Sequence, residues 1–219
     1  MTNLAHSSKE SVVSIETLLH SDEFMDLISY SKSQSFNIVY RDFELYLPLV
    51  CCGKKNGLRI RLYDVDVDTI VNSFTNLGFS IKYNPPNPYV SSDKIMDVYV
   101  TTQSNVNLLE SVSYNTEDFE YGKFLGVPDE DNTWFTEASE ERIQEVQPVS
   151  HYVGYSDNDI KYARVIPWLC KPTLERLTNT IDIGKNWFNF SVSLEHKFGY
   201  SNAREYCEDR HNCEDHSFY

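Results

Sequence analysis

Four residues near the end of the chain have types and a spacing that could hold a metal ion. They are Cys207, His211, Cys213 and His216. Zn²⁺ takes thiolate and imidazole ligands in a tetrahedral arrangement. The spacing C-x3-H-x-C-x2-H is not that of the usual zinc fingers or ribbons, so a flexible acidic tail is the alternative interpretation. A zinc ion here would be structural, because the pattern leaves no open coordination position. The sequence indicates no other cofactor.

A second set of polar side chains lies between residues 129 and 170. Asp129, Glu130 and Asp131 are consecutive acids. His151 and Cys170 have the types of a base and a nucleophile, but nothing local orients one toward the other. A single cysteine of this kind is more often a small buried hydrophobe. We therefore treat these five residues as candidate ligand-binding residues and predict no catalytic residue.

One basic cluster lies in the first half of the chain. Arg59 and Arg61 alternate along a predicted strand, and Lys54 and Lys55 precede them. On one face of that strand the arginines could bind a phosphate or an acidic partner. The alternative is a face that is solvated or paired with neighbouring acids.

Motifs of common catalytic sites are missing from the sequence. It has eight glycines and contains no Gly-rich phosphate loop, no G-x-S-x-G and no H-E-x-x-H. A nucleotide cradle needs glycine-rich backbone at the start of a helix, so nucleotide binding is poorly supported.

The elements that would position these residues begin with a small sheet. Strands are predicted at 36–40, 43–52, 58–63, 79–83 and 95–102, and helices at 21–30 and 66–77. β-Branched and aromatic residues favour the strands, and apolar residues at helical spacing favour the helices. The β-α-β-β order over 58–102 is that of a ferredoxin-like unit.

After about residue 104 the apolar period becomes helical. Helices are predicted at 104–112, 116–125, 128–146 and 172–198, and an extended segment at 162–168. Gly126 suits the left-handed position that ends a helix, and Pro128 can begin the next one. Residues 1–13 and 201–219 are expected to be flexible tails. The sequence therefore predicts one α+β domain over 1–219, in which a mixed or antiparallel sheet is covered by helices of the C-terminal half.

The composition favours a folded, acidic protein. The chain has 219 residues, is 41% hydrophobic and carries a formal net charge of -14. A negative field repels nucleic acid and anionic membranes, so direct nucleic-acid binding is not expected. The sequence shows no signal peptide and no run of about 18 apolar residues. This predicts a cytoplasmic protein, or a virion-associated one if it is viral, with its five cysteines as free thiols.

The second half of the chain resembles an uncharacterised archaeal family that is known as a domain of unknown function. That family carries a Leu-Gly-x-Pro-x-Cys-Cys corner and a later Ile-Pro-Cys motif before a long helix that contains a glycine. The matching residues here are Leu125-Gly126-Val127-Pro128, Ile166-Pro167 and Gly184. Glu130 and Asp131 stand in place of the paired cysteines, and Trp168 in place of the first cysteine of the second motif. The resemblance implies a shared scaffold in which this member has lost any thiol site.

Together these features predict a soluble, non-enzymatic interaction protein, such as an accessory or viral factor. Fifteen tyrosines cannot all be buried, and exposed tyrosine is common at interfaces. Its partner would be another protein or a second copy of itself, with no membrane contact. Two alternatives stay open. One is a metal- or small-ligand-binding enzyme-like domain, and the other is a DNA mimic whose acids imitate phosphates.

Overall fold

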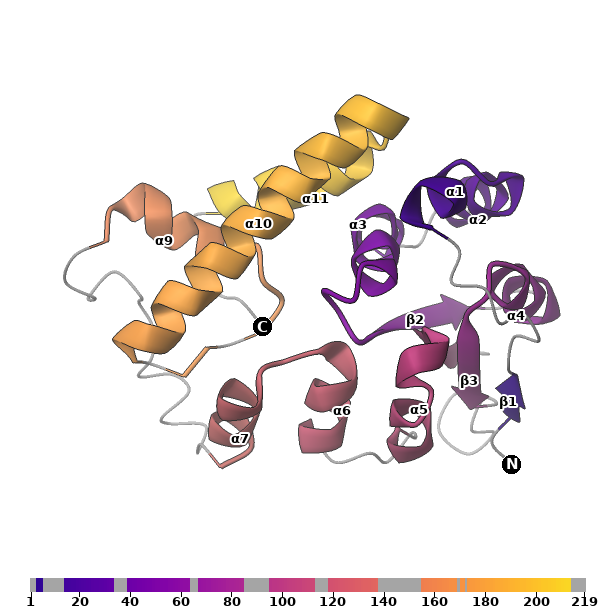
Figure 1. Ribbon diagram of the computed structural model, residues 1–219, viewed down its shortest axis with the longest axis horizontal. Coiled ribbons are helices and arrows are strands. Elements are labelled where there is room, and N and C mark those ends of the chain that lie inside the picture. The colour runs from indigo at the N-terminus through magenta and orange to yellow at the C-terminus, as the bar shows by residue number, and fades with distance from the viewer. Residues whose placement is uncertain are drawn as a thin grey trace. The chain divides into compact units, whose positions relative to one another are not determined.

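The chain forms two compact units, which comprise residues 1–126 and 127–219. The computed structural model describes residues 3–5, 14–33, 39–63, 67–84, 95–112, 118–137, 155–168, 170–171 and 173–213 (Figure 1). The expectation of a single domain stays a prediction.

The first unit contains a small antiparallel sheet. Its strands are β1 (Asn3–Ala5), β2 (Gly57–Tyr63), β3 (Ser80–Asn84) and β4 (Ile95–Thr101). Their order is β1-β3-β4-β2, and each neighbouring pair is antiparallel. The α+β class is therefore confirmed in its broad form, although most described residues are helical. Asn3–Ala5 pairs with β3, so the expected flexible tail over 1–13 is wrong for these three residues.

One face of the sheet carries the larger apolar core. Leu58 and Ile60 of β2 lie opposite Val100 and Val98 of β4, and all four are buried. This face packs against helices α3 (Val39–Cys51) and α4 (Val67–Asn76), with α1 (Ile15–Leu19) and α2 (Asp22–Ser33) beside them (Figure 1). The alternation that the sequence predicted for β2 is thus confirmed.

Helices α5 (Leu108–Ser111) and α6 (Asp118–Leu125) cover the opposite face of the sheet, after a 3-10 turn at Gln103–Asn105. A smaller apolar cluster joins them to the sheet, formed by Tyr99, Leu109, Val112 and Phe124. The predicted helix boundary is confirmed, because α6 ends at Leu125 and Gly126 has a φ of 84°.

The strands predicted at 36–40 and 43–52 are wrong where the structure describes them. Residues 39–51 form α3, and residues 36–38 lie outside the described part. Every side chain from 43 to 50 is buried, so this run has no apolar period that separates strand from helix. Pro48 argues against a central strand, because proline cannot donate a hydrogen bond to a neighbouring strand.

The second unit is helical where the structure describes it. It contains α7 (Asp129–Glu137), α9 (Asp157–Ala163), α10 (Leu174–Phe198) and α11 (Ser201–Asn212). The long helix predicted at 172–198 is confirmed as α10. The extended segment predicted at 162–168 is wrong, because α9 continues to Ala163 and turns follow it.

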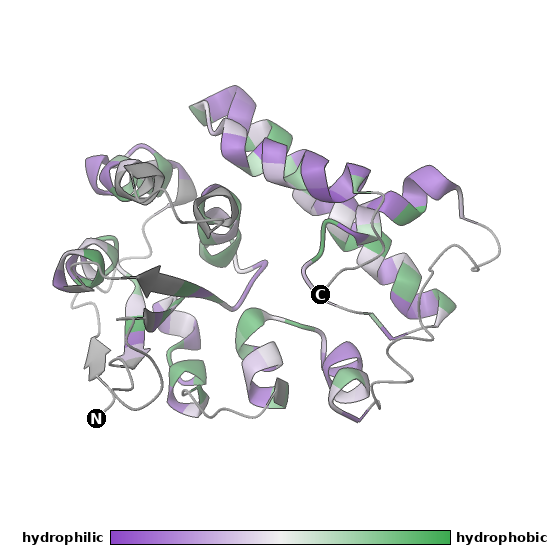
Figure 2. Cartoon of the chain, turned by 180° about the vertical axis from the view of Figure 1, so that it is seen from behind, coloured by the Kyte–Doolittle hydropathy of each residue, from purple (hydrophilic) through white to green (hydrophobic). Residues whose placement is uncertain are grey.

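The flexible tail predicted at 201–219 is wrong for 201–212, which form α11. This helix is strongly hydrophilic (Figure 2), and its two fully buried side chains are Ala203 and Cys207. Small buried residues give a weak apolar signal, which is why the sequence pattern did not reveal the helix. Residues 214–219 lie outside the described part.

A glycine allows α9 and α10 to pack closely. A methyl carbon added at Gly184 would lie 1.9 Å from the carbonyl oxygen of Tyr162. The obstacle is backbone, which cannot rotate away as a side chain can. Gly184 is therefore required by the packing of α9 on α10.

We expect Gly184→Ala to lower the free energy of unfolding by about 3 kcal/mol, because the new methyl group must push α9 away. Urea denaturation measures this change. The matched control is Asn189→Ala, an exposed position on the same helix, where alanine should cost nothing. Equal stability of the two variants would contradict the close packing.

Candidate functional site

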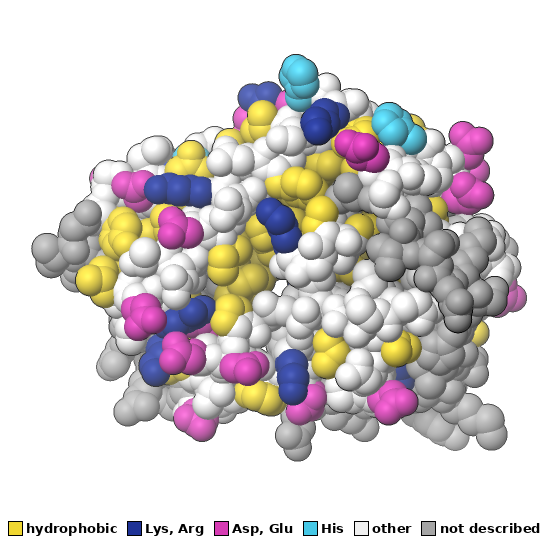
Figure 3. Space-filling model, viewed as in Figure 1, with side chains coloured by type: hydrophobic (Ala, Val, Ile, Leu, Met, Phe, Trp, Pro, Cys, Tyr) yellow, Lys and Arg dark blue, Asp and Glu magenta, His cyan; other side chains and the backbone are white. Residues whose placement is uncertain are grey.

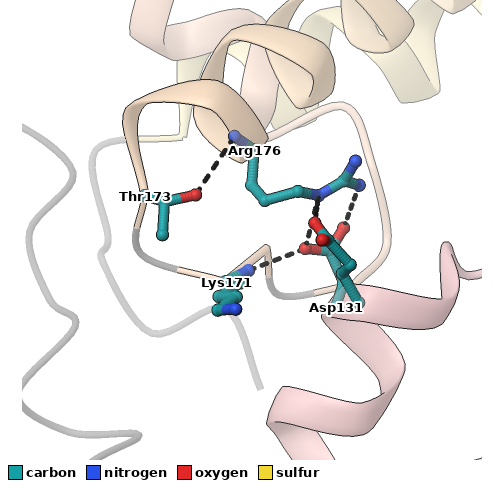
Figure 4. A network of polar contacts seen from close by, with 5 residues as sticks. Asp131, Lys171, Thr173 and Arg176 are labelled. Atoms are coloured by element: carbon teal, nitrogen blue, oxygen red, sulfur yellow. Dashed lines mark hydrogen bonds and ion pairs between the residues drawn. The ribbon is translucent and has the colours of Figure 1, made fainter.

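Asp131 joins α7 to the start of α10 (Figure 4). Its Oδ1 accepts hydrogen bonds from the Lys171 backbone N–H at 2.8 Å and from Arg176 Nε at 3.0 Å. Its Oδ2 accepts a second bond from Arg176 Nη2 at 2.6 Å. The Asp131 side chain is fully buried, and that of Arg176 is 12% exposed. Two parallel charge-assisted bonds of this kind fix orientation as well as distance.

Local sequence explains why both partners lie at helix starts. Thr173 caps α10, and its side-chain oxygen accepts a hydrogen bond from the Arg176 backbone N–H at 3.3 Å. Asp131 lies in the first turn of α7, where the positive end of the helix favours a carboxylate. The Lys171 N–H that binds Asp131 lies three residues before the first residue of α10. The Asp131 carboxylate is therefore stabilised by the N-terminus of α7 and hydrogen-bonded to residues at and just before the N-terminus of α10.

Cys170 lies beside this ion pair. Burial raises the pKa of its thiol, the nearby Thr180 hydroxyl lowers it, Asp131 raises it and Arg176 lowers it. Thr180 is itself buried, and its hydroxyl forms no well-aligned hydrogen bond with described residues. Because burial dominates, the thiol stays protonated at neutral pH.

Among the five candidate ligand-binding residues of the second unit, the structure brings Asp131 and Cys170 together. Asp129 and Glu130 are exposed, and Glu130 reaches Arg176 at 3.8 Å. His151 lies outside the described residues. Both Asp131 oxygens accept hydrogen bonds and the Cys170 thiol is protonated, so this arrangement stabilises the fold rather than activating a nucleophile.

The basic cluster of the first unit is largely bonded within that unit. Arg59 Nη2 lies 2.7 Å from Asp97 Oδ2, and its guanidinium lies over the Tyr121 ring. Lys55 is 3% exposed and donates a hydrogen bond to the Leu125 carbonyl at 2.9 Å. Lys54 is exposed. Arg61 belongs to β2, but its side chain lies outside the described part. The cationic groups of Arg59 and Lys55, which a phosphate would have to contact, are therefore already bonded to other residues of the first unit.

Three of the four predicted zinc ligands lie on or beside α11. Cys207 is fully buried, His211 follows it by one turn, and Cys213 ends the helix. The His211 ring packs between Tyr162, at 4.7 Å between ring centroids, and Phe188, at 5.5 Å. In the described part of the chain, no three Cys, His, Asp or Glu side chains are placed to share an ion. His216 lies outside that part, so the four-ligand zinc site stays a prediction.

Two cations bind backbone carbonyls at or just beyond helix ends, buried Lys82 and half-buried Arg210, and neither contact was predicted from the sequence. Lys82 Nζ donates to the carbonyls of Leu109, at 2.7 Å, and Glu110, at 3.2 Å. Arg210 donates to the carbonyls of Arg164, at 2.8 Å, and Ile166, at 3.3 Å. Lysine between apolar strand residues is the local signal for Lys82, and none exists for Arg210. These contacts are structural.

Comparisons with known proteins return no relative. No protein-family model, no curated protein and no solved structure matches the chain. Among the helices that the structure describes, none combines the length and apolar character needed to cross a bilayer.

We expect Asp131→Ala to lower the free energy of unfolding by roughly 3–5 kcal/mol, because it leaves the Arg176 guanidinium uncompensated in the interior. Combining it with Arg176→Met should restore much of the loss. Glu130→Gln is the matched control, since Glu130 is 66% exposed and its side chain reaches Arg176 only at 3.8 Å. A double variant no more stable than Asp131→Ala would contradict the importance of the uncompensated charge.

Alkylation of Cys170 by iodoacetamide should still accelerate with pH above pH 9. The thiolate is the reactive form, and burial raises the pKa of this thiol above its ordinary value. Peptide mass spectrometry of the folded protein measures the rate, and the urea-unfolded chain is the control. The rate stops rising with pH once the thiol is fully ionised. If the folded protein reaches this plateau at the same pH as the unfolded control, or at a lower one, the pKa of Cys170 is ordinary or lowered.

Proposed function

We propose that the protein is a non-enzymatic interaction protein that binds a basic macromolecular partner through acidic helix surfaces. The observation that carries this proposal is the state of its buried charges. Asp131 is bonded to Arg176, Asp97 to Arg59, and Lys55 and Lys82 to helix carbonyls. A catalytic acid or base must be able to bond to its substrate. The charged atoms of these residues are instead bonded to other parts of the fold.

The exposed residues favour a partner that is both basic and apolar. Among the described side chains, four large apolar ones are exposed: Met25 at 44%, Phe135 at 37%, Leu174 at 55% and Val192 at 37%. Three of them have acidic neighbours on the same helix, because Met25 adjoins Asp26, Phe135 precedes Glu137 and Leu174 adjoins Glu175. Exposed apolar residues beside charges are typical of a binding surface with a polar rim.

The distribution of charge on the surface bears on the DNA-mimic alternative. On the face drawn in Figure 3, acidic side chains lie among basic ones and do not gather in a single field. A DNA mimic needs rows of acids that imitate phosphates. The view therefore favours an ordinary protein partner.

A ligand-binding, enzyme-like domain is the second candidate. What favours it is that Asp131 of α7 interacts with Arg176 of α10 and with Cys170, which lie 45 and 39 residues away from it in the sequence. Metal analysis of the purified protein separates the two candidates. One equivalent of tightly held zinc or iron would favour the second.

The finer fold predictions are also proposals. We propose that β2, α4, β3 and β4 form a ferredoxin-like split unit. In its support, β4 lies between β2 and β3, which run in the same direction and are connected through α4. The likeness of the second half to the archaeal family is supported by the helix end at Leu125-Gly126 and by Gly184 within α10.

The 219-residue chain should bind a fluorescent Lys/Leu amphipathic helix more tightly than a matched Glu/Leu helix. Fluorescence anisotropy measures both affinities. Attraction between exposed charges is screened by salt, so binding of the basic peptide should weaken roughly tenfold between 50 and 300 mM NaCl.

The combined variant Met25→Ser, Phe135→Ser and Leu174→Ser should weaken this binding without lowering stability, because all three side chains are exposed. The matched control replaces Ser29, Thr133 and Asn179 by alanine, at exposed polar positions of the same three helices. Equal affinity for the acidic peptide, or equal effects of the two variants, would refute the proposal.

A further inference from the structure

The two faces of the sheet in the first unit differ in chemistry. The face under α3 and α4 carries Leu58, Ile60, Ile81, Val98 and Val100, all buried. Between the sheet and helices α5 and α6 lies a largely polar layer of buried side chains: Ser80, Lys82, Asp97 and Thr101. An apolar interface is stabilised by exclusion of water, whereas a polar interface gains less from it.

The apolar contacts that hold α5 and α6 on this face form one small cluster of four buried side chains, with Val106, Leu108, Tyr121 and Leu125 partly buried around it. Tyr99 is the buried aromatic residue that the sheet contributes, and Leu109, Val112 and Phe124 pack on it. The remaining attachments are polar, because Lys82 donates to the Leu109 carbonyl, and Lys55 to the Leu125 carbonyl. Both lysines bind the C-terminal ends of these helices, where a cation is favoured.

If α5 and α6 separated from the sheet, water would hydrate polar groups that are now buried. This hydration would offset part of the free energy of separating the helices. The Ser80 hydroxyl is fully buried and forms no hydrogen bond with any described residue. Lys82 is 6% exposed, and burial lowers the pKa of its ammonium group. Removing these two groups from water is unfavourable in the closed structure, and both would be hydrated in an open one. No such gain is available on the apolar face.

We infer that α5 and α6 form a cover that opens as one unit, uncovering Ser80, Lys82 and Tyr99 while the sheet stays packed on α3 and α4. A region with few buried apolar contacts opens at a lower free energy than the core of the same domain. The described parts of the chain that belong to the cover are 103–112, after the end of β4, and 118–126; residues 113–117 lie outside the described part. This motion lies within the first unit and does not require the proposed partner.

Hydrogen exchange of the full-length protein, followed by mass spectrometry, tests this inference. The amides of 108–111 and 118–125 should exchange at least roughly tenfold faster than those of β4 and α3. The two helices should also respond together, by similar factors, when denaturant is added below the unfolding midpoint. Independent fraying of two short helices would instead give two unrelated responses.

A matched pair of variants locates the weak interface. Val112 and Val100 are both fully buried, the first in the cover and the second on the apolar face of the sheet. Val112→Ala should accelerate exchange in α5 and α6 while β4 and α4 keep their rates. Val100→Ala should accelerate exchange throughout the first unit. The inference is overturned if wild-type α5 and α6 exchange as slowly as β4, or if the two variants give the same pattern.

Discussion

Burial of charge is the constraint on which both units depend, and each unit meets it at the ends of helices. Buried Lys55 and Lys82 bind the last carbonyls of α6 and α5, and half-buried Arg210 binds the carbonyl of Arg164, which caps α9. Asp131 lies in the first turn of α7 and accepts the N–H that precedes α10. Helix ends present unpaired carbonyl or N–H groups with a matching partial charge, so a single buried side chain satisfies them and is itself stabilised.

This use of charge changes how the reactive-looking residues are understood. Asp131, Arg59 and Lys55 had the types expected of a ligand site, but their bonds are internal. The charge-assisted hydrogen bonds that could bind a phosphate or a carboxylate here connect one structural element to another. Function is then expected at the exposed residues, where acids adjoin large apolar side chains such as Met25 and Leu174.

The sequence predicted elements well where the apolar pattern was periodic. Strand β2 and helices α4 and α10 agree with their predicted places, because alternation and helical spacing are local properties. It failed at α3, where eight consecutive residues are buried and no period remains, and at α11, where alanine and cysteine carry the burial. The site was predicted in part. Asp131 and Cys170 were candidates, but Arg176 and Thr180 were not.

The sequence by itself determined the acidic character, most helix and strand positions, and the caps that start and end helices. Only the tertiary structure decided which charges meet. Asp131 and Arg176 are 45 residues apart, Lys82 and Leu109 are 27 apart, and Lys55 and Leu125 are 70 apart. No local propensity encodes such pairings, because each depends on how separate elements pack. The packing also buried the polar face of strands β3 and β4 beneath two short helices.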